Sequence, residues 1–297
     1  MTESLSITND NFHDLIRDCL AILPHDKTAC DMMQNWDVSR VTDCSLLFWE
    51  ELMDQNAWKL SVGAEWFNVD LSAWNTSSCT TMHGMFHGAS VFNQPLDSWD
   101  VSNVMDMARM FQNAKQFHPD SLSRWNTAQV TDMSHMFRYA ESFAPIQPLL
   151  WNVERVRSFQ YMFHNALDFN NPGLATWQVT GARDDDDDDV TNQQESTSSN
   201  VDRLWAFKSM FDGAISFNVD VSSWDISGAK SLAFMFHVRM YTEKKELHNV
   251  KKIVSILKIS KQFIVLFVRW YSSETMFTIY TIILCSPLVV VSERTCL

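Results

Sequence analysis

The sequence predicts an α/β repeat solenoid of about seven units, each 25–26 residues long and built from a short strand followed by a short helix. Three aromatic registers support this prediction. A Trp recurs at spacings of 25 or 26 residues from Trp74 to Trp177, a Phe follows its Trp after 12 residues, and a second Phe follows after 6 more. A fixed period of 20–50 residues is typical of repeat proteins whose units stack.

One period, residues 92–111, shows what each unit is expected to form. Trp99, Val101 and Val104 make a short apolar run with β-branched residues, which favours a brief strand. The next apolar residues fall at i, i+3, i+4 and i+7, a spacing that predicts one buried stripe on a short helix: Met107, Met110, Phe111 and Ala114.

The repeated aromatic residues are interpreted as a continuous core. A helix or strand this short is not stable alone in water, so each unit must bury its apolar side chains against the next one. The predicted core register is Trp74, Trp99, Trp125, Trp151, Trp177, Trp224, Phe86, Phe111, Phe137, Phe163, Phe211 and Phe236.

The repeat motif resembles a known family. The run Trp99-Asp100-Val101-Ser102-Asn103-Val104, followed by Met107, Met110-Phe111, Ala114 and Phe117, is similar to the DUF285 repeat of the BspA-like leucine-rich-repeat surface proteins. The similarity covers roughly residues 35–237. It implies a leucine-rich-repeat-like solenoid and a role in adhesion or recognition at a cell surface or membrane, and it brings no catalytic motif.

Composition narrows the classes of function. The net charge of −13 argues against nucleic acid as a partner, because phosphate binding requires a basic patch. The six Cys form no CxxC pair, and Cys44 and Cys79 are interpreted as small buried apolar residues, since they occupy the registers of Met107 and Val104.

The chain divides into three regions. Residues 1–35 show no signal-peptide pattern and contain an amphipathic run from Phe12 to Leu23, which predicts an N-terminal cap helix. Residues 36–237 form the repeat region, with one insert near 49–65, where a helix is a candidate, and another near 182–204. The second insert holds six consecutive Asp, Asp184 to Asp189, for which a solvated loop is favoured over a calcium site.

Residues 238–297 depart from the repeat. They are rich in Lys and Arg and contain the apolar run 276–291, about 16 residues long and marginally short for a membrane span. Three interpretations stay open: a membrane anchor with a basic flank, a divergent cap, or sequence that is not part of the natural fold, such as a mispredicted exon.

Two rows of polar residues are candidate sites. The residue after each Trp can accept a hydrogen bond and is interpreted as a structural ladder, with an acidic ligand-binding stripe as the alternative: Asp37, Asn75, Asp100, Asn126, Asn152, Gln178 and Asp225. The residue after each Met-Phe pair varies in chemistry and is expected to form an exposed contact row: His87, Gln112, Arg138, His164, Asp212 and His237.

No catalytic or cofactor motif is present in the sequence. It has no nucleophile elbow, glycine-rich phosphate loop or paired-carboxylate pattern. His83 and His87 lie four residues apart, but they lack the Glu of a zinc-protease motif, so no metal site is expected.

The expected function is recognition without catalysis. In this hypothesis the repeat region presents an extended acidic surface to a protein or glycan partner. The alternative is a structural scaffold tethered to a membrane through residues 276–291, and an enzyme built on the repeats is the least favoured class.

Overall fold

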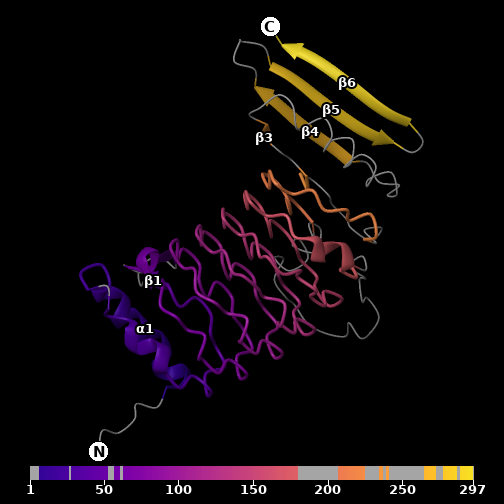
Figure 1. Ribbon diagram of the computed structural model, residues 1–297. Helices are drawn as coiled ribbons and strands as arrows, with labels where there is room; N and C mark the ends of the chain where they lie inside the picture. The colour runs from indigo at the N-terminus through magenta and orange to yellow at the C-terminus, as the bar shows by residue number, and fades with distance from the viewer. Residues whose placement is uncertain are drawn as a thin grey trace, which may run out of the picture.

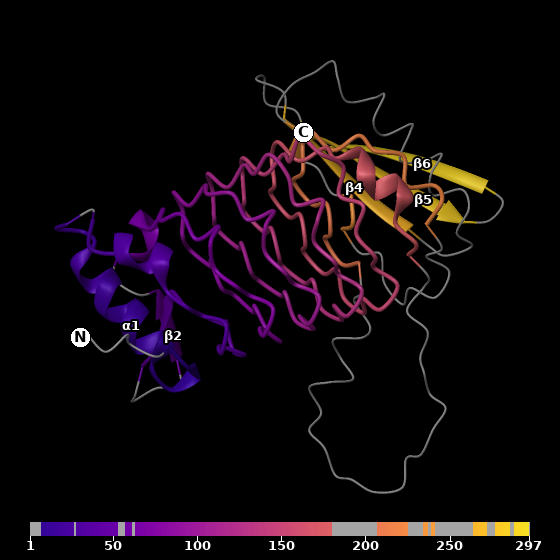
Figure 2. The same ribbon diagram turned by 60° about the horizontal axis from the view of Figure 1, so that its bottom comes forward.

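The computed structural model describes residues 7–26, 28–52, 57–60, 63–179, 207–224, 234–236, 239–240, 264–271, 277–285 and 288–296. The repeats form an elongated stack of loops that starts beside the helix α1 (Asn9–Ile22) (Figures 1 and 2). We call the described residues 36–48, 63–179, 207–224 and 234–236 the repeat stack. Asp225, His237 and the insert 182–204 lie outside the described residues.

Helix α1 covers the first unit of the stack. It begins after Thr8, whose backbone N–H is bonded by the Asn11 side chain in a capping box. Its buried face includes Phe12, whose ring centroid lies 5.6 Å from that of Trp74. A short 3₁₀ helix η1 (Asp31–Asn35) then leads to Trp36. The helix therefore closes the apolar end that an open stack would expose.

The prediction of an α/β repeat solenoid is wrong. In the described part of the repeat stack, the units contain neither an α-helix nor a strand of several residues, and their backbone consists of turns and irregular segments. The only regular elements there are two short 3₁₀ helices, η2 (Ala64–Trp66) and η3 (Pro172–Thr176). The expected strand around Val101–Val104 is a turn, closed by the Val104 N–H donating to the Val101 carbonyl over 3.0 Å.

Left-handed backbone explains why the expected helices do not form. Arg109 and Asn113 have φ values of 60° and 61°, and the equivalent residues of neighbouring units are also left-handed. An α-helix cannot contain such residues every four positions. The chain instead reverses repeatedly, and Met107, Met110, Phe111 and Ala114 still all face the core with no exposed surface. The same spacing of apolar residues thus arises from a series of turns.

Backbone hydrogen bonds alternate between each unit and its neighbour. The N–H groups of Gly84, Phe86 and Gly88 donate to carbonyls of the next unit over 2.8 Å each. The intervening N–H groups of Met85, His87 and Ala89 donate three residues back within their own unit. Single-residue parallel bridges continue this pairing along the stack: Asp43–Thr81, Thr81–Asp106, Asp106–Asp132 and Asp132–Ser158. Each unit therefore depends on its neighbours for half of these hydrogen bonds.

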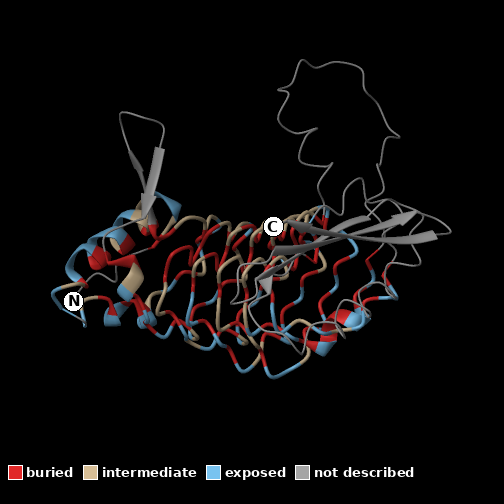
Figure 3. Cartoon of the chain, turned by 90° about the horizontal axis from the view of Figure 1, so that it is seen from above, coloured by how far each residue is buried: buried red, intermediate tan, exposed pale blue. Residues whose placement is uncertain are grey.

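The core consists of aromatic ladders, and Figure 3 shows buried residues in every turn of the stack. Neighbouring Phe rings at the Met-Phe position stack with centroids 5.4–5.6 Å apart from Phe86 to Phe211. Trp rings form a parallel ladder, in which Trp125 and Trp151 are 5.9 Å apart. Each buried indole N–H also donates to a carbonyl of the preceding unit, as Trp125 does to Leu96 over 2.9 Å. The ladders therefore bury the apolar rings and also give each buried indole N–H a hydrogen-bond acceptor.

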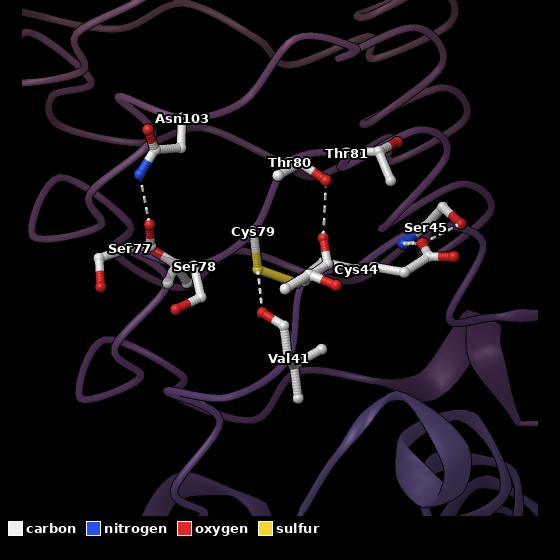
Figure 4. Close-up of a disulfide and its surroundings, with 12 residues drawn as sticks. Val41, Cys44, Ser45, Ser77, Ser78, Cys79, Thr80, Thr81 and Asn103 are labelled. Atoms are coloured by element: carbon white, nitrogen blue, oxygen red, sulfur yellow. Dashed lines mark hydrogen bonds between the residues drawn. A yellow bond between two sulfur atoms is a disulfide. The ribbon is translucent and has the colours of Figure 1, made fainter.

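Cys44 and Cys79 form a disulfide, so their interpretation as simple apolar residues is wrong (Figure 4). Both are buried, and they join the first two units of the stack across 35 residues of sequence. Their neighbouring backbone also pairs, because the Cys44 N–H donates to the Thr81 carbonyl over 3.1 Å. Apolar register alone could not reveal that the two sulfur atoms meet.

The strands of the structure lie outside the repeat stack. The first insert forms an antiparallel hairpin of β1 (Trp49–Leu52) and β2 (Ala57–Leu60) instead of a helix. A second sheet has the order β3–β4–β5–β6, with β3 (Arg239–Met240), β4 (Ile264–Tyr271), β5 (Phe277–Cys285) and β6 (Leu288–Cys296). The apolar run 276–291 thus falls mainly in β5 and β6. Among the described residues, no helix has the length and apolar character needed to cross a membrane.

Candidate functional site

The ladder residues after each Trp bond to local backbone. Asp37, Asp100 and Asn152 accept the N–H of the residue two positions later, each over 3.0 Å. Asn75 and Asn126 do the same over 3.2 and 3.3 Å. Hydrogen bonds from the side chain and backbone of Ser102 lower the pKa of Asp100. Gln178 differs, because its Nε2 donates to the Thr176 carbonyl. These side chains close turns, as Asn and Asp commonly do.

The expected contact row is neither uniformly exposed nor acidic. His87 and Gln112 are buried, with 7% of their surface exposed, so the prediction of exposure is wrong for both. Arg138, His164 and Asp212 are half-buried. Asp212 is the single acid of the row within the described residues. One residue of the adjoining left-handed register contacts the row, because Arg109 Nη1 donates to Gln112 Oε1. The residues of that register define a different surface.

We call this surface the Arg–His–Tyr face and define it by Arg109, His135, Arg138, Tyr139, Tyr161 and His164. All six are half-buried and come from three consecutive units. Arg109, His135 and Tyr161 occupy one left-handed register, with φ values of 60°, 58° and 56°. Because the backbone of each unit repeats that of the last, the three side chains are brought into one row on one side of the stack.

Aromatic and cationic groups contact one another across this face. The rings of His135 and Tyr161 stack with centroids 4.9 Å apart. The Arg138 guanidinium lies over two rings, 5.0 Å from the centre of Tyr139 and 5.2 Å from that of Tyr161. His164 meets both Tyr rings edge-on. Cation–π and edge-to-face contacts of this kind hold the side chains in defined positions before any ligand arrives.

A polar hollow of about 330 Å³ adjoins the face. Its volume lies at the lower end of the range typical of small-molecule sites. Every residue that lines it is polar, and two of the lining side chains carry guanidinium groups. The lining residues are Arg109, Thr131, Asp132, Ser134, His135, Arg157, Ser158 and Gln160.

The charges around the hollow are mainly positive, although the chain as a whole is acidic. Asp132 is the single acid in the lining, and its Oδ1 accepts the Ser134 backbone N–H over 2.7 Å. Burial, followed by repulsion from Arg138, lowers the pKa of Arg109, and the charge of Asp132 opposes this shift in part. Burial and the charges of Arg109 and Arg138 also lower the pKa of His135 to about 3. His135 is therefore neutral at pH 7 and surrounded by cations.

Three buried atoms on this face have no hydrogen-bond partner among the described residues: His135 Nδ1, Arg138 Nε and His164 Nδ1. The last of these still lies within ion-pair distance of Asp212. Arg109, Arg138 and Arg157 likewise form no salt bridge with any described carboxylate. Arg109 Nη1 does donate to Gln112 Oε1 over 3.2 Å. Unpaired buried donors cost free energy, so this region can gain binding energy from an external acceptor.

Two other histidines, His83 and His164, lie beside carboxylates. His83 Nδ1 lies 3.1 Å from Asp106 Oδ2, and His164 Nδ1 lies 3.3 Å from Asp212 Oδ2. The described residues include no group of three or more His, Cys, Asp or Glu that could hold a metal ion.

Arg109, His135 and Tyr161 were not among the site residues expected from the sequence. Their signal was present: the position two residues after the first Met or Phe of each stripe changes from Gly84 to Arg109, His135 and Tyr161. In a helix with this apolar stripe, the position would lie on the face away from the core. Only the left-handed turns show that it forms a row with Arg138 and His164.

The fold and this face define a repeat protein with an aromatic-ladder core and one surface rich in Arg, His and Tyr. The DUF285 family, described as a Mycoplasma protein of unknown function, matches residues 21–147, 117–190 and 189–264. The chain therefore belongs to the DUF285 family. No curated protein matches it. No solved structure matches it either.

Proposed function

We propose that this protein is a non-enzymatic recognition module that binds a glycan through the Arg–His–Tyr face and its adjoining hollow. The observation that supports this proposal best is the hollow of about 330 Å³, whose lining residues carry hydroxyl, amide, carboxylate, imidazole and guanidinium groups. A saccharide offers many donors and acceptors in a volume of this size. A protein partner would be favoured by an apolar anchor pocket, which this lining lacks.

The neighbouring Tyr rings support a recognition role. Tyr presents a rigid apolar ring with a polar hydroxyl and is common in binding surfaces. Tyr139 and Tyr161 are held in place by Arg138, so little side-chain entropy is lost on binding. The resemblance to BspA-like surface proteins, which implies adhesion or recognition, is in keeping with this proposal.

A glycan array probed with the labelled full chain tests the proposal. The array includes neutral, uronate-containing and sulfated oligosaccharides. We expect selective binding to a subset of glycans and at least about a tenfold loss of affinity in Tyr161→Ser, because the face loses a ring that contacts His135 and Arg138.

Ile146→Ala is the matched control. Its side chain is 66% exposed and belongs to neither the face nor the hollow, so the variant keeps the affinity of the unchanged protein. A folded protein that binds no glycan on the array, or a Tyr161→Ser variant that binds as well as Ile146→Ala, would overturn the proposal.

A further inference from the structure

We propose that the polar hollow is a subsite for the oxyanion substituent of an acidic sugar, a sulfate ester or a carboxylate, bound by Arg109 and Arg157. The identification of the ligand as a sugar rests on the proposed function. The anion site itself rests on the charges of the hollow and on His135 Nδ1, unpaired among the described residues, and it can be tested without any glycan.

The hollow contains more positive than negative side chains. Arg109 and Arg157 both line it, against the single carboxylate of Asp132. None of the described acids forms a salt bridge with either guanidinium. Guanidinium groups present paired N–H donors that match carboxylate and sulfate oxygens. The hollow therefore offers two strong anion-binding groups that the described carboxylates leave available.

A further cation, Arg138, lies near Arg109 and repels it. Burial lowers the pKa of Arg109, and repulsion from Arg138 lowers it further, while attraction to Asp132 offsets this only in part. An anion between the units would relieve this repulsion, and the binding free energy would include that relief. Two like charges held together on an acidic protein are costly unless a third group compensates them.

The hollow is also lined by an imidazole, that of His135, with one nitrogen, Nδ1, that is buried and lacks a hydrogen-bond partner among the described residues. A neutral imidazole has one donor and one acceptor nitrogen, so the ring can donate to an oxyanion or accept from a sugar hydroxyl once a rotation of the side chain brings the buried Nδ1 to the hollow. Ser134, Ser158 and Gln160 supply further hydrogen-bonding groups around the same volume.

Calorimetric titration of the full chain with sodium sulfate, and separately with sodium glucuronate, tests the site at constant ionic strength. Saturable binding of sulfate alone assigns a sulfate ester, and saturable binding of glucuronate alone assigns a carboxylate. Either result supports the proposal. Absence of saturable binding of both anions overturns it.

Arg157→Gln is the diagnostic variant because its side chain is exposed and its loss should not unfold the protein. We expect at least about a tenfold loss of anion affinity, the factor that one charge-assisted hydrogen bond supplies. Arg155→Gln is the matched control, because it also removes one positive charge, only two residues away in sequence. The Arg155 side chain donates to Gln129, and neither residue lines the hollow. An equal loss of anion affinity in the two variants would show that the arginines act only by long-range attraction, and it would overturn the assigned site.

A spectroscopic readout separates this site from one elsewhere on the chain. Histidine NMR of the full chain should show the pKa of His135 rising when sulfate or glucuronate saturates the protein, because a nearby anion favours the protonated ring. The ring signals of the exposed His25 should not change when the anion is added. An unchanged pKa of His135 under saturating anion would place the binding elsewhere and overturn the proposal. If the anions bind here but no glycan binds, the recognition proposal alone fails.

Discussion

At the scale of single residues, burial decides which side chains stabilise the fold and in which protonation state a titratable side chain is held. Trp125 is 3% exposed, stacks on Trp151 and Phe111, and has its indole N–H bonded to Leu96. His135, in contrast, has a buried nitrogen without a partner and lies near two arginines. The first residue is stabilised by its neighbours on both sides. The second is held in one protonation state by them.

Trp125→Ala should lower the free energy of unfolding by roughly 3–5 kcal/mol, because it leaves a cavity in the Trp ladder and removes a buried hydrogen bond. Urea unfolding followed by circular dichroism measures this loss. The control Met105→Ala, at a side chain 52% exposed, should change stability by under about 0.5 kcal/mol. A loss below about 1 kcal/mol for Trp125→Ala would contradict the ladder as the core.

The low pKa values of His87 and His135 predict a stability that falls in mild acid. Burial and nearby Arg109 lower the pKa of His87 to about 4 and that of His135 to about 3, from 6.5. His83, Arg138 and His164 add further repulsion. Between these values and 6.5, the unfolded chain binds more protons than the folded chain, so the free energy of unfolding rises with pH.

The contribution is fully present above pH 6.5 and is lost as the pH falls toward 3. His135→Gln should therefore lose less stability between pH 7 and pH 4.5 than the unchanged protein, by roughly 1–3 kcal/mol. Urea unfolding at both pH values measures the difference, with the exposed His25→Gln as control. Equal pH dependence in the two variants would show that His135 is not held neutral.

At the scale of elements, the repeating unit is a series of turns that depends on left-handed residues. Ser209, with φ of 52°, occupies the same register as Arg109 and His135. Gly84 and Gly213 also have positive φ values, of 58° and 75°. A Cβ atom at Gly213 would collide with the Asn165 side chain of the preceding unit. The turns thus combine conformational strain with close packing between neighbouring units.

Ser209→Gly distinguishes turns from helices by the sign of its effect. In a left-handed turn, Gly relieves strain and should raise the free energy of unfolding by up to about 1 kcal/mol. In a helix the same change would lower it by a similar amount. Thermal or urea unfolding gives the sign, and Ser216→Gly, an exposed position without positive φ, should lower stability. Destabilisation by Ser209→Gly would contradict the left-handed turn.

At the scale of the whole molecule, stability comes from contacts between neighbouring units and from the ends of the stack. Backbone hydrogen bonds and ring ladders join each unit to the next. Helix α1 covers one end through Phe12 and Trp74. The Cys44–Cys79 disulfide fastens the first two units at this end. Opening of the stack should therefore be opposed most strongly beside α1.

Removal of the disulfide should lower the free energy of unfolding by about 3–4 kcal/mol, because the unfolded chain then regains the entropy that closing a 35-residue loop removes. Urea unfolding of the double variant Cys44→Ala, Cys79→Ala measures the loss. A thiol reductant should destabilise the unchanged protein by a similar amount and leave the double variant unaffected. A reductant that acts equally on both proteins would show that this bond does not stabilise the stack.

Sequence alone determined the period and the side chains that turn inward. Trp125, Phe137 and Met133 recur at fixed spacings, and residues at these spacings are buried because every unit repeats the same backbone. The DUF285 membership follows from the same motif. The spacing could not reveal the backbone conformation, since paired turns with left-handed residues bury the same positions as a short helix does.

Tertiary structure alone decided the turn conformation, the disulfide and the composition of the Arg–His–Tyr face. Arg109, His135 and Tyr161 are about 26 residues apart in sequence and become neighbours only when the units stack. Cys44 and Cys79 meet for the same reason, although an insert separates their units. A repeat fixes which residues share a register. The stacking of one unit on the next decides which of them touch, and with it the charges that a ligand would meet.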